Sequence, residues 1–245
     1  MGEVRIQTVI FLIDLFKYSS AELDAIQLSL KVALLCTVIL LPLALLVGWL
    51  LARKRFFGKS VIEGIVHLPL VLPPVTVGYV LLIMFGRNGW LGSFLYENWG
   101  IQIAFSFTAA VIAAIVVSFP LVTRSIRLSI ELVDRNYEEA ARTLGASNLR
   151  VFFTITLPLA LPGVISGAIL AFARSLGEFG ATISFAGNIE GETQTLPLAI
   201  FSSMQVPGQE TSTLKLVFVS VILSLAAMIG AEYLNRKVLN RKSNG

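Results

Sequence analysis

Few residues in this chain of 245 could perform covalent or metal chemistry. Cys36 is its one cysteine and His67 its one histidine, so the sequence offers neither an internal disulfide nor a cluster of zinc ligands. We expect His67 to be a buried imidazole with a hydrogen-bond partner. The apolar stretches carry no His, Asp and Glu set at the spacing of a metal site or proton relay. The sequence therefore predicts a protein that is not an enzyme.

One basic segment ends like a nucleotide-binding loop. A P-loop reads G-x-x-x-x-G-K-[ST], because its backbone N–H groups cradle phosphate. Gly58-Lys59-Ser60 matches the end of that motif, but Arg53 stands where the first glycine belongs. We therefore predict that the chain itself binds no cofactor, neither ATP nor Mg²⁺, and that this segment is a turn at a membrane edge.

Two opposite charges lie at helical spacing near the end of an apolar stretch. Arg174 and Glu178 are four residues apart, so on a helix they can neutralise each other. One interpretation is a structural ion pair. The other is that Arg174 contacts an oxyanion in transit, with Gly177 and Gly180 letting the backbone approach it.

The composition indicates that most of this chain is surrounded by lipid and not by water. Hydrophobic residues make up 56% of the chain and charged residues 14%, values that exclude both a soluble globular domain and a disordered chain. Five stretches reach the roughly 20 apolar residues that a spanning helix needs. Val32–Leu51 is apolar on every face, which excludes a transmembrane barrel. The sequence predicts an all-α polytopic membrane protein with spans at Ala25–Leu51, Val61–Phe85, Phe105–Thr123, Pro158–Phe179 and Leu214–Leu234.

The basic residues predict how the chain is oriented. Most of its 19 Lys and Arg residues lie in the loop after the first span, in the loop 124–157 and after the last span. Cytoplasmic loops carry such an excess, so we expect the N-terminus outside and a cytoplasmic tail over 235–245. The segment 1–24 is too short in apolar residues to span, because Asp14 and Lys17 interrupt it. We expect it to be an interfacial helix on the outer side, with a sixth span and a damaged signal peptide as the alternatives.

Prolines and small residues mark two of the spans. Pro69, Pro73 and Pro74 in the second span remove backbone donors, so this helix should be bent or locally unwound. The freed carbonyls must face protein or water, which allows either a lining role in a pathway or a structural kink. The fourth span has small residues at every fourth position, a pattern that favours close packing of another helix. These are Gly163, Gly167, Ala171 and Ser175.

The loop 124–157 contains a short helix with clear end signals. Asp134 is a good N-cap, and Gly145 suits the left-handed residue that ends a helix. Glu138 and Arg142 are spaced for an ion pair within this helix. The residues alone leave open whether it is a solvated linker or a docking element for another protein.

The same loop resembles a known signature. Glu139-Ala140-Ala141, then Gly145 after three residues, then Ile155-Thr156-Leu157-Pro158 is similar to the loop of ABC-importer permeases that docks on their ATPase subunit. His67–Tyr79 and Ala173–Ile183 with Gly191–Thr193 are similar to the molybdate and sulfate group of these permeases, and more to its molybdate members.

This resemblance implies a MetI-like, type I importer fold with a five-span core in the bacterial inner membrane. It implies two copies of the chain, two ATPase subunits that bind ATP and Mg²⁺, and an external molybdate-binding protein for which Thr193–Gln205 is a candidate surface. The expected cargo is molybdate or tungstate. A sulfate or thiosulfate permease is the alternative, and an ATP-independent transporter is a weaker one because the Pro-interrupted span has no repeat partner.

The resemblance also assigns candidate site residues. The residues expected to couple the chain to the ATPase are Glu139, Ala140, Ala141, Gly145, Ile155, Leu157 and Pro158. The residues expected along the translocation pathway are Pro73, Pro74, Arg174, Gly177, Glu178 and Gly180.

Overall fold

A computed structural model describes residues 18–243, with side chains beyond residue 230 described for Tyr233 alone. The predicted interfacial helix over 1–24 therefore lies mostly outside the described residues. Its last residues, from Ser20 on, belong instead to the first long helix, α2. That helix begins early because the Ser19 hydroxyl accepts from the Glu22 amide while the Glu22 carboxylate accepts from the Ser19 amide.

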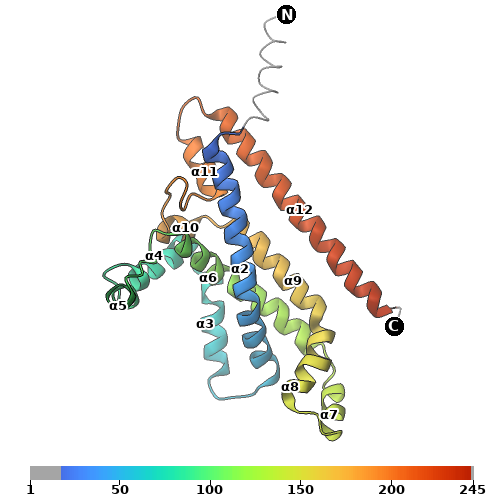
Figure 1. The fold of residues 1–245 in the computed structure, drawn as a ribbon. Helices are drawn as coiled ribbons and strands as arrows, with labels where there is room; N and C mark the ends of the chain where they lie inside the picture. Colours follow the sequence, from blue (N-terminus) through green and yellow to red (C-terminus); the bar gives the residue numbers. More distant parts are fainter. Residues whose placement is uncertain (1–17, 244–245) are drawn as a thin grey trace, which may run out of the picture.

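The described residues form helices and no strands, as predicted (Figure 1). The long helices are α2 (Ser20–Arg53), α6 (Phe107–Glu131), α9 (Leu157–Leu176) and α12 (Glu210–Ser243). The shorter ones are α3 (Lys59–Val71), α4 (Pro74–Phe85), α5 (Trp90–Trp99), α7 (Arg135–Thr143), α8 (Asn148–Val151), α10 (Gly180–Phe185) and α11 (Leu196–Met204). A π-helical turn, η1 (Phe152–Thr156), joins α8 to α9.

Among residues 18–243, four helices are long and apolar enough to cross a membrane, and α3 with α4 makes a fifth span if the bent pair counts as one. The number agrees with the five predicted spans. The helix at the third predicted span, Phe105–Thr123, is longer than that apolar stretch, because α6 continues past Thr123 to Glu131. Its last turns bury Ile126 and Ile130, while Arg127 and Glu131 pair on the exposed face at 2.8 Å. Hydropathy falls there but the helix does not end, and the loop expected from residue 124 begins only at Leu132.

The central helix is α6. In its most apolar window 61% of the residues are buried, against 6% in α12, which lies at the edge of the bundle. Small residues let the neighbours of α6 approach closely: a Cβ added at Gly163 of α9 would stand 2.1 Å from the Ser129 Cβ. One at Gly48 of α2 would stand 3.3 Å from the Thr123 carbonyl oxygen. The predicted small-residue stripe of the fourth span thus packs against α6.

The second span is broken, as its prolines predicted. α3 and α4 meet at an angle of 114°. Pro73 is the N-cap of α4 and Pro74 its first residue, a position where a missing N–H costs nothing. α4 and the following α5 therefore project sideways from the bundle (Figure 1). The sequence had not predicted α5, whose Trp90, Phe94 and Trp99 are exposed.

Candidate functional site

The predicted short helix is present, and both of its end signals are confirmed. The Asp134 carboxylate accepts a hydrogen bond of 2.9 Å from the Asn136 amide at the start of α7. Gly145, just beyond its end, has φ +86°, the left-handed conformation that glycine adopts without strain. α7 lies at the end of the bundle opposite α11 (Figure 1).

The outward face of α7 and its flanks leave large apolar side chains uncovered. Glu139 and Ala140 are exposed, and Tyr137 is 61% exposed. Leu132 and Leu144, on either side of the helix, are 86% and 89% exposed. Apolar groups gathered at a helix end that projects beyond the long spans are typical of a surface that another protein covers.

The chain then enters the fourth span through an irregular turn. The Leu157 amide donates to the Phe152 carbonyl, one residue farther back than in an α-helix, which makes η1 a π turn. Pro158 has no N–H to offer the Thr154 carbonyl, so the wider turn lies directly ahead of it. Ile155 and Leu157 are half-buried and Pro158 is exposed. The sequence signature therefore includes a π-helical turn that its spacing did not reveal, within a helix that runs continuously from Asn148 to Leu176.

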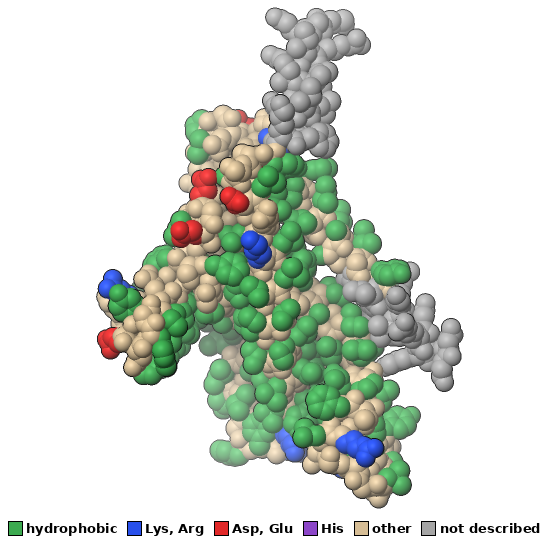
Figure 2. Space-filling model, in the orientation of Figure 1, with side chains coloured by type: hydrophobic (Ala, Val, Ile, Leu, Met, Phe, Trp, Pro, Cys, Tyr) green, Lys and Arg blue, Asp and Glu red, His purple; other side chains and the backbone are tan. Residues whose placement is uncertain are grey.

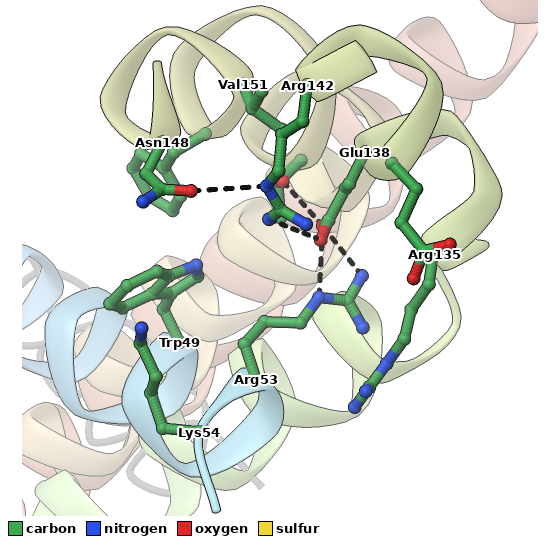
Figure 3. Close-up of a pocket in the computed structure, with 11 residues that line it drawn as sticks. Trp49, Arg53, Lys54, Arg135, Glu138, Arg142, Asn148 and Val151 are labelled. Atoms are coloured by element: carbon green, nitrogen blue, oxygen red, sulfur yellow. Dashed lines mark hydrogen bonds and ion pairs between the residues drawn. The ribbon is translucent and has the colours of Figure 1, made fainter. Parts of the chain in front are cut away.

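A polar pocket of about 350 Å³ lies between α7 and the end of α2 (Figure 3). Arg53 and Glu138 meet in it at 2.9 Å. The predicted pair of Glu138 with Arg142 is also present, at the longer distance of 3.6 Å. The remaining lining residues are Trp49, Lys54, Arg135, Glu139, Asn148, Val151, Phe152 and Thr156.

The sequence did not predict the contact between Arg53 and Glu138. The two residues are 85 positions apart, and Arg53 drew notice only as a mismatch to the P-loop. Of the predicted turn at Gly58-Lys59-Ser60, only Gly58 lies in a turn: it has φ +83° and caps α3, whose first two residues are Lys59 and Ser60. Lys59 lies 3.8 Å from Glu63 in the next turn of that helix.

A second group of candidate residues surrounds the break in the second span. Pro74 contacts α10, where a Cβ added at Gly180 would stand 2.8 Å from the Pro74 Cβ. One turn on, a Cβ at Gly78 would stand 2.5 Å from the Ala181 carbonyl oxygen. The break thus brings α4 into backbone contact with α10, and Pro73 and Pro74 themselves remain exposed.

The predicted ion pair lies just before α10. Arg174 Nη1 is 2.7 Å from Glu178 Oε2, with side-chain exposures of 30% and 2%. Glu178 Oε1 accepts from the Ala181 amide at 2.8 Å, so the same carboxylate also orders the start of α10. Gly177 is exposed, and a Cβ added there would meet nothing within 4 Å.

The other candidates have plainer surroundings. His67 is half-buried rather than buried, with Nδ1 2.8 Å from the Glu63 carbonyl oxygen. The described residues include no group of three or more His, Cys, Asp or Glu that could hold a metal ion. In the segment Thr193–Gln205, α11 is held to α2 by a 2.6 Å bond from the Leu196 amide to Ser29. A pocket of about 600 Å³ lies beside α11, with Glu22, Glu190 and Lys215 among its lining residues.

Comparison with known proteins identifies the family. The model of the binding-protein-dependent transport system inner membrane component matches residues 42–240. The chain belongs to this family. It is an ABC-importer permease and a multi-pass inner-membrane protein, of the kind that acts with a separate ATPase and a binding protein.

Relatives and solved structures agree with that assignment. The permease is 55% identical over 224 residues to the molybdenum transport system permease protein ModB of Haemophilus influenzae, covering 91% of this chain and 98% of that protein. It is 53% identical over 215 residues to ModB of Escherichia coli K12, covering 88% and 94%. The sulfate transport system permease protein CysW of Synechocystis is 34% identical over 221 residues, covering 90% and 79%.

The solved structures support the fold. A bacterial ABC transporter that imports the acidic polysaccharide alginate matches with a TM-score of 0.74 at 16% identity, covering 93% of this chain and 82% of that one. The MetNI methionine ABC transporter, in an inward-facing conformation, matches with a TM-score of 0.64 at 18% identity, covering 89% and 94%. The predicted MetI-like fold is confirmed.

Proposed function

We propose that this permease passes molybdate, and tungstate as its chemical analogue, across the inner membrane. The observation that carries the proposal is its 55% identity to a molybdenum permease over 98% of that protein, against 34% to a sulfate permease over 79%. Arg174 near the break is neutralised by Glu178. A passage that offers little net charge releases an oxyanion easily, which suits delivery by a separate binding protein.

The energy comes from a partner, not from this chain. Two ATPase subunits bind ATP with Mg²⁺ and dock on α7, where Glu139, Ala140 and Ala141 form the contact and Gly145 ends the docking helix. Exposed Tyr137 in α7 and Leu144 at its end support this assignment, because large apolar side chains exposed at a short helix are typical of a protein interface. Movement of α7 then reaches the fourth span through Ile155, Leu157 and Pro158.

The passage forms between two copies of the permease. Pro73 and Pro74 are exposed in the single chain, and α4 with α5 projects from the bundle, which supports a second copy facing them (Figure 1). The residues that we propose to border the passage lie around this break. They are Pro73, Pro74, Arg174, Gly177, Glu178 and Gly180.

The distribution of charged side chains supports an assignment of which end of the bundle lies outside the cell and which lies in the cytoplasm. Figure 2 shows acidic side chains gathered near the α11 end and basic ones at the end that holds α7. With α7 in the cytoplasm, the N-terminus lies outside and the tail inside. The pocket beside α11 then faces outward, where a molybdate-binding protein docks.

Uptake by the reconstituted complex tests the cargo. The permease with its ATPase and binding protein in vesicles should accumulate radiolabelled molybdate only with ATP, and excess tungstate should compete while excess sulfate should not. Uptake of sulfate in place of molybdate would make the permease a sulfate transporter. Molybdate uptake without ATP would make it a secondary transporter.

A further inference from the structure

A buried charged joint holds α7 against the membrane-spanning part of the permease (Figure 3). Arg53 is the last residue of α2, and its side chain is 8% exposed. Its Nε donates to Glu138 Oε1 at 3.0 Å, and its Nη2 lies 2.9 Å from the same oxygen. Nη2 also donates to the Val133 carbonyl at 2.8 Å, just ahead of α7. Arg53 thus grips both the helix and the chain that leads into it.

The carboxylate of Glu138 also reaches the fourth span. Thr156, at the end of the π turn η1, donates its hydroxyl to Glu138 Oε1 at 2.7 Å. The Thr156 residue is 1% exposed and the Glu138 side chain 4%. One carboxylate of α7 is therefore bonded to the end of α2 and to the turn that opens α9.

These buried polar contacts are better suited to transmitting movement between helices than to stabilising the fold. Burying an ion pair costs desolvation that offsets most of its attraction, so such a pair contributes little net stability. Its bonds are, however, short, directional and charge-assisted. If α7 moves, we expect the ends of α2 and α9 to follow it, because breaking the bonds would leave the buried Glu138 carboxylate with Arg142, at 3.6 Å, as its remaining charged partner.

We propose that Arg53, Glu138 and Thr156 form a joint that makes the first span move together with the fourth when α7 moves. All three are positioning residues. The proposal rests on the proposed ATPase docking at α7 and divides the helix into two faces. Glu139, which also lines the pocket, and Ala140 are exposed to the partner. The buried Glu138, next to them in sequence, passes the displacement on to two spans.

The test measures molybdate uptake and ATP hydrolysis in the same vesicles, per amount of assembled complex. Glu138→Gln and Arg53→Gln should each lower the molybdate moved per ATP about tenfold, the size of effect that one residue in a coupling network has. The double variant should be no worse than either single variant, because the two residues act as one unit.

Two further variants keep the test decisive. Glu131→Gln removes an exposed ion pair with Arg127 at the same end of the bundle and should leave the ratio unchanged. Thr156→Val loses one hydrogen bond and no charge, so it should assemble normally and lower the ratio about threefold even if Glu138→Gln does not fold.

The joint is refuted if uptake and hydrolysis fall in equal proportion in Thr156→Val and in every charge variant that assembles. It is also refuted if the losses of the two single charge variants multiply in the double variant. Failure of the proposed cargo looks different, because the wild-type complex would then take up no molybdate. In that case the same ratios are measured with sulfate.

Discussion

The two candidate regions are built from different interactions. At the α7 end, Glu138 is bonded to Arg53 and Thr156, so three segments are joined by directional polar contacts. Around the break, α4 meets α10 through Pro74, Gly78 and Gly180, at backbone distances that leave no room for side chains. Hydrogen bonds and ion pairs constrain direction as well as distance, whereas apolar packing constrains shape and volume. The α7 end is thus held by polar bonds between three segments, whereas α4 is held to α10 by close backbone packing.

The strongest challenge to this comparison is a side chain inserted at the break. Gly78→Val would place a Cβ 2.5 Å from the Ala181 carbonyl oxygen, and we expect overpacking to cost about 3 kcal/mol or more. The amount of folded permease in membranes should fall steeply, as measured by quantitative immunoblotting. Gly64→Val is the matched control, since nothing lies within 4 Å of a Cβ there. Equal amounts of both variants would mean that α4 and α10 do not pack closely.

A charge reversal on the exposed face of α7 tests whether this face binds the ATPase. Glu139→Lys changes an exposed residue beside the buried joint, so we expect normal permease levels but an affinity for the ATPase reduced roughly 30-fold. Co-purification of the two subunits measures this. Glu97→Lys, on exposed α5, serves as the control of equal charge change. Normal ATPase recovery with Glu139→Lys would remove the docking role from this face.

Variants of the ion pair just before α10 distinguish a role in stability from a role in transport. Arg174→Gln leaves the Glu178 carboxylate buried without its partner, which should destabilise the permease by about 3 kcal/mol and lower its level. Adding Glu178→Gln should restore the level, because no charge then remains buried. The KM for molybdate uptake by this double variant should rise if Arg174 also contacts the anion. An unchanged KM would leave the pair a purely structural role.

The smallest effect on the permease is expected from cysteine substitutions that only report the orientation of the chain in the membrane. Ser20→Cys lies at the exposed start of α2 and should react with an impermeant thiol reagent added outside intact cells. Arg55→Cys, beyond the other end of the same helix, should react only after the membrane is opened, and native Cys36 is buried. If Ser20→Cys does not react with the reagent from outside, the end of the bundle that holds Ser20 is not the outer end.

Local signals in the sequence predicted much of this structure. Long apolar runs predicted the spans, Asp134 and Gly145 predicted the ends of α7, and the prolines predicted the broken span, because each effect acts within a few residues. The extension of α6 to Glu131 was missed, since hydropathy falls where Arg127 pairs with Glu131 and Glu63. The π turn before Pro158 and the exposed helix α5 also lacked a clear local signal.

Sequence by itself determined that this chain is a helical membrane protein and which loop carries the family signature, because hydropathy and motif spacing are properties of neighbouring residues. Only the tertiary structure decided which faces meet. The pairing of Arg53 with Glu138, across 85 positions, and the contact of Gly78 with Ala181 depend on how α2, α4, α7 and α10 are brought together. Such contacts follow from the packing of whole helices around α6, which no window of neighbouring residues encodes.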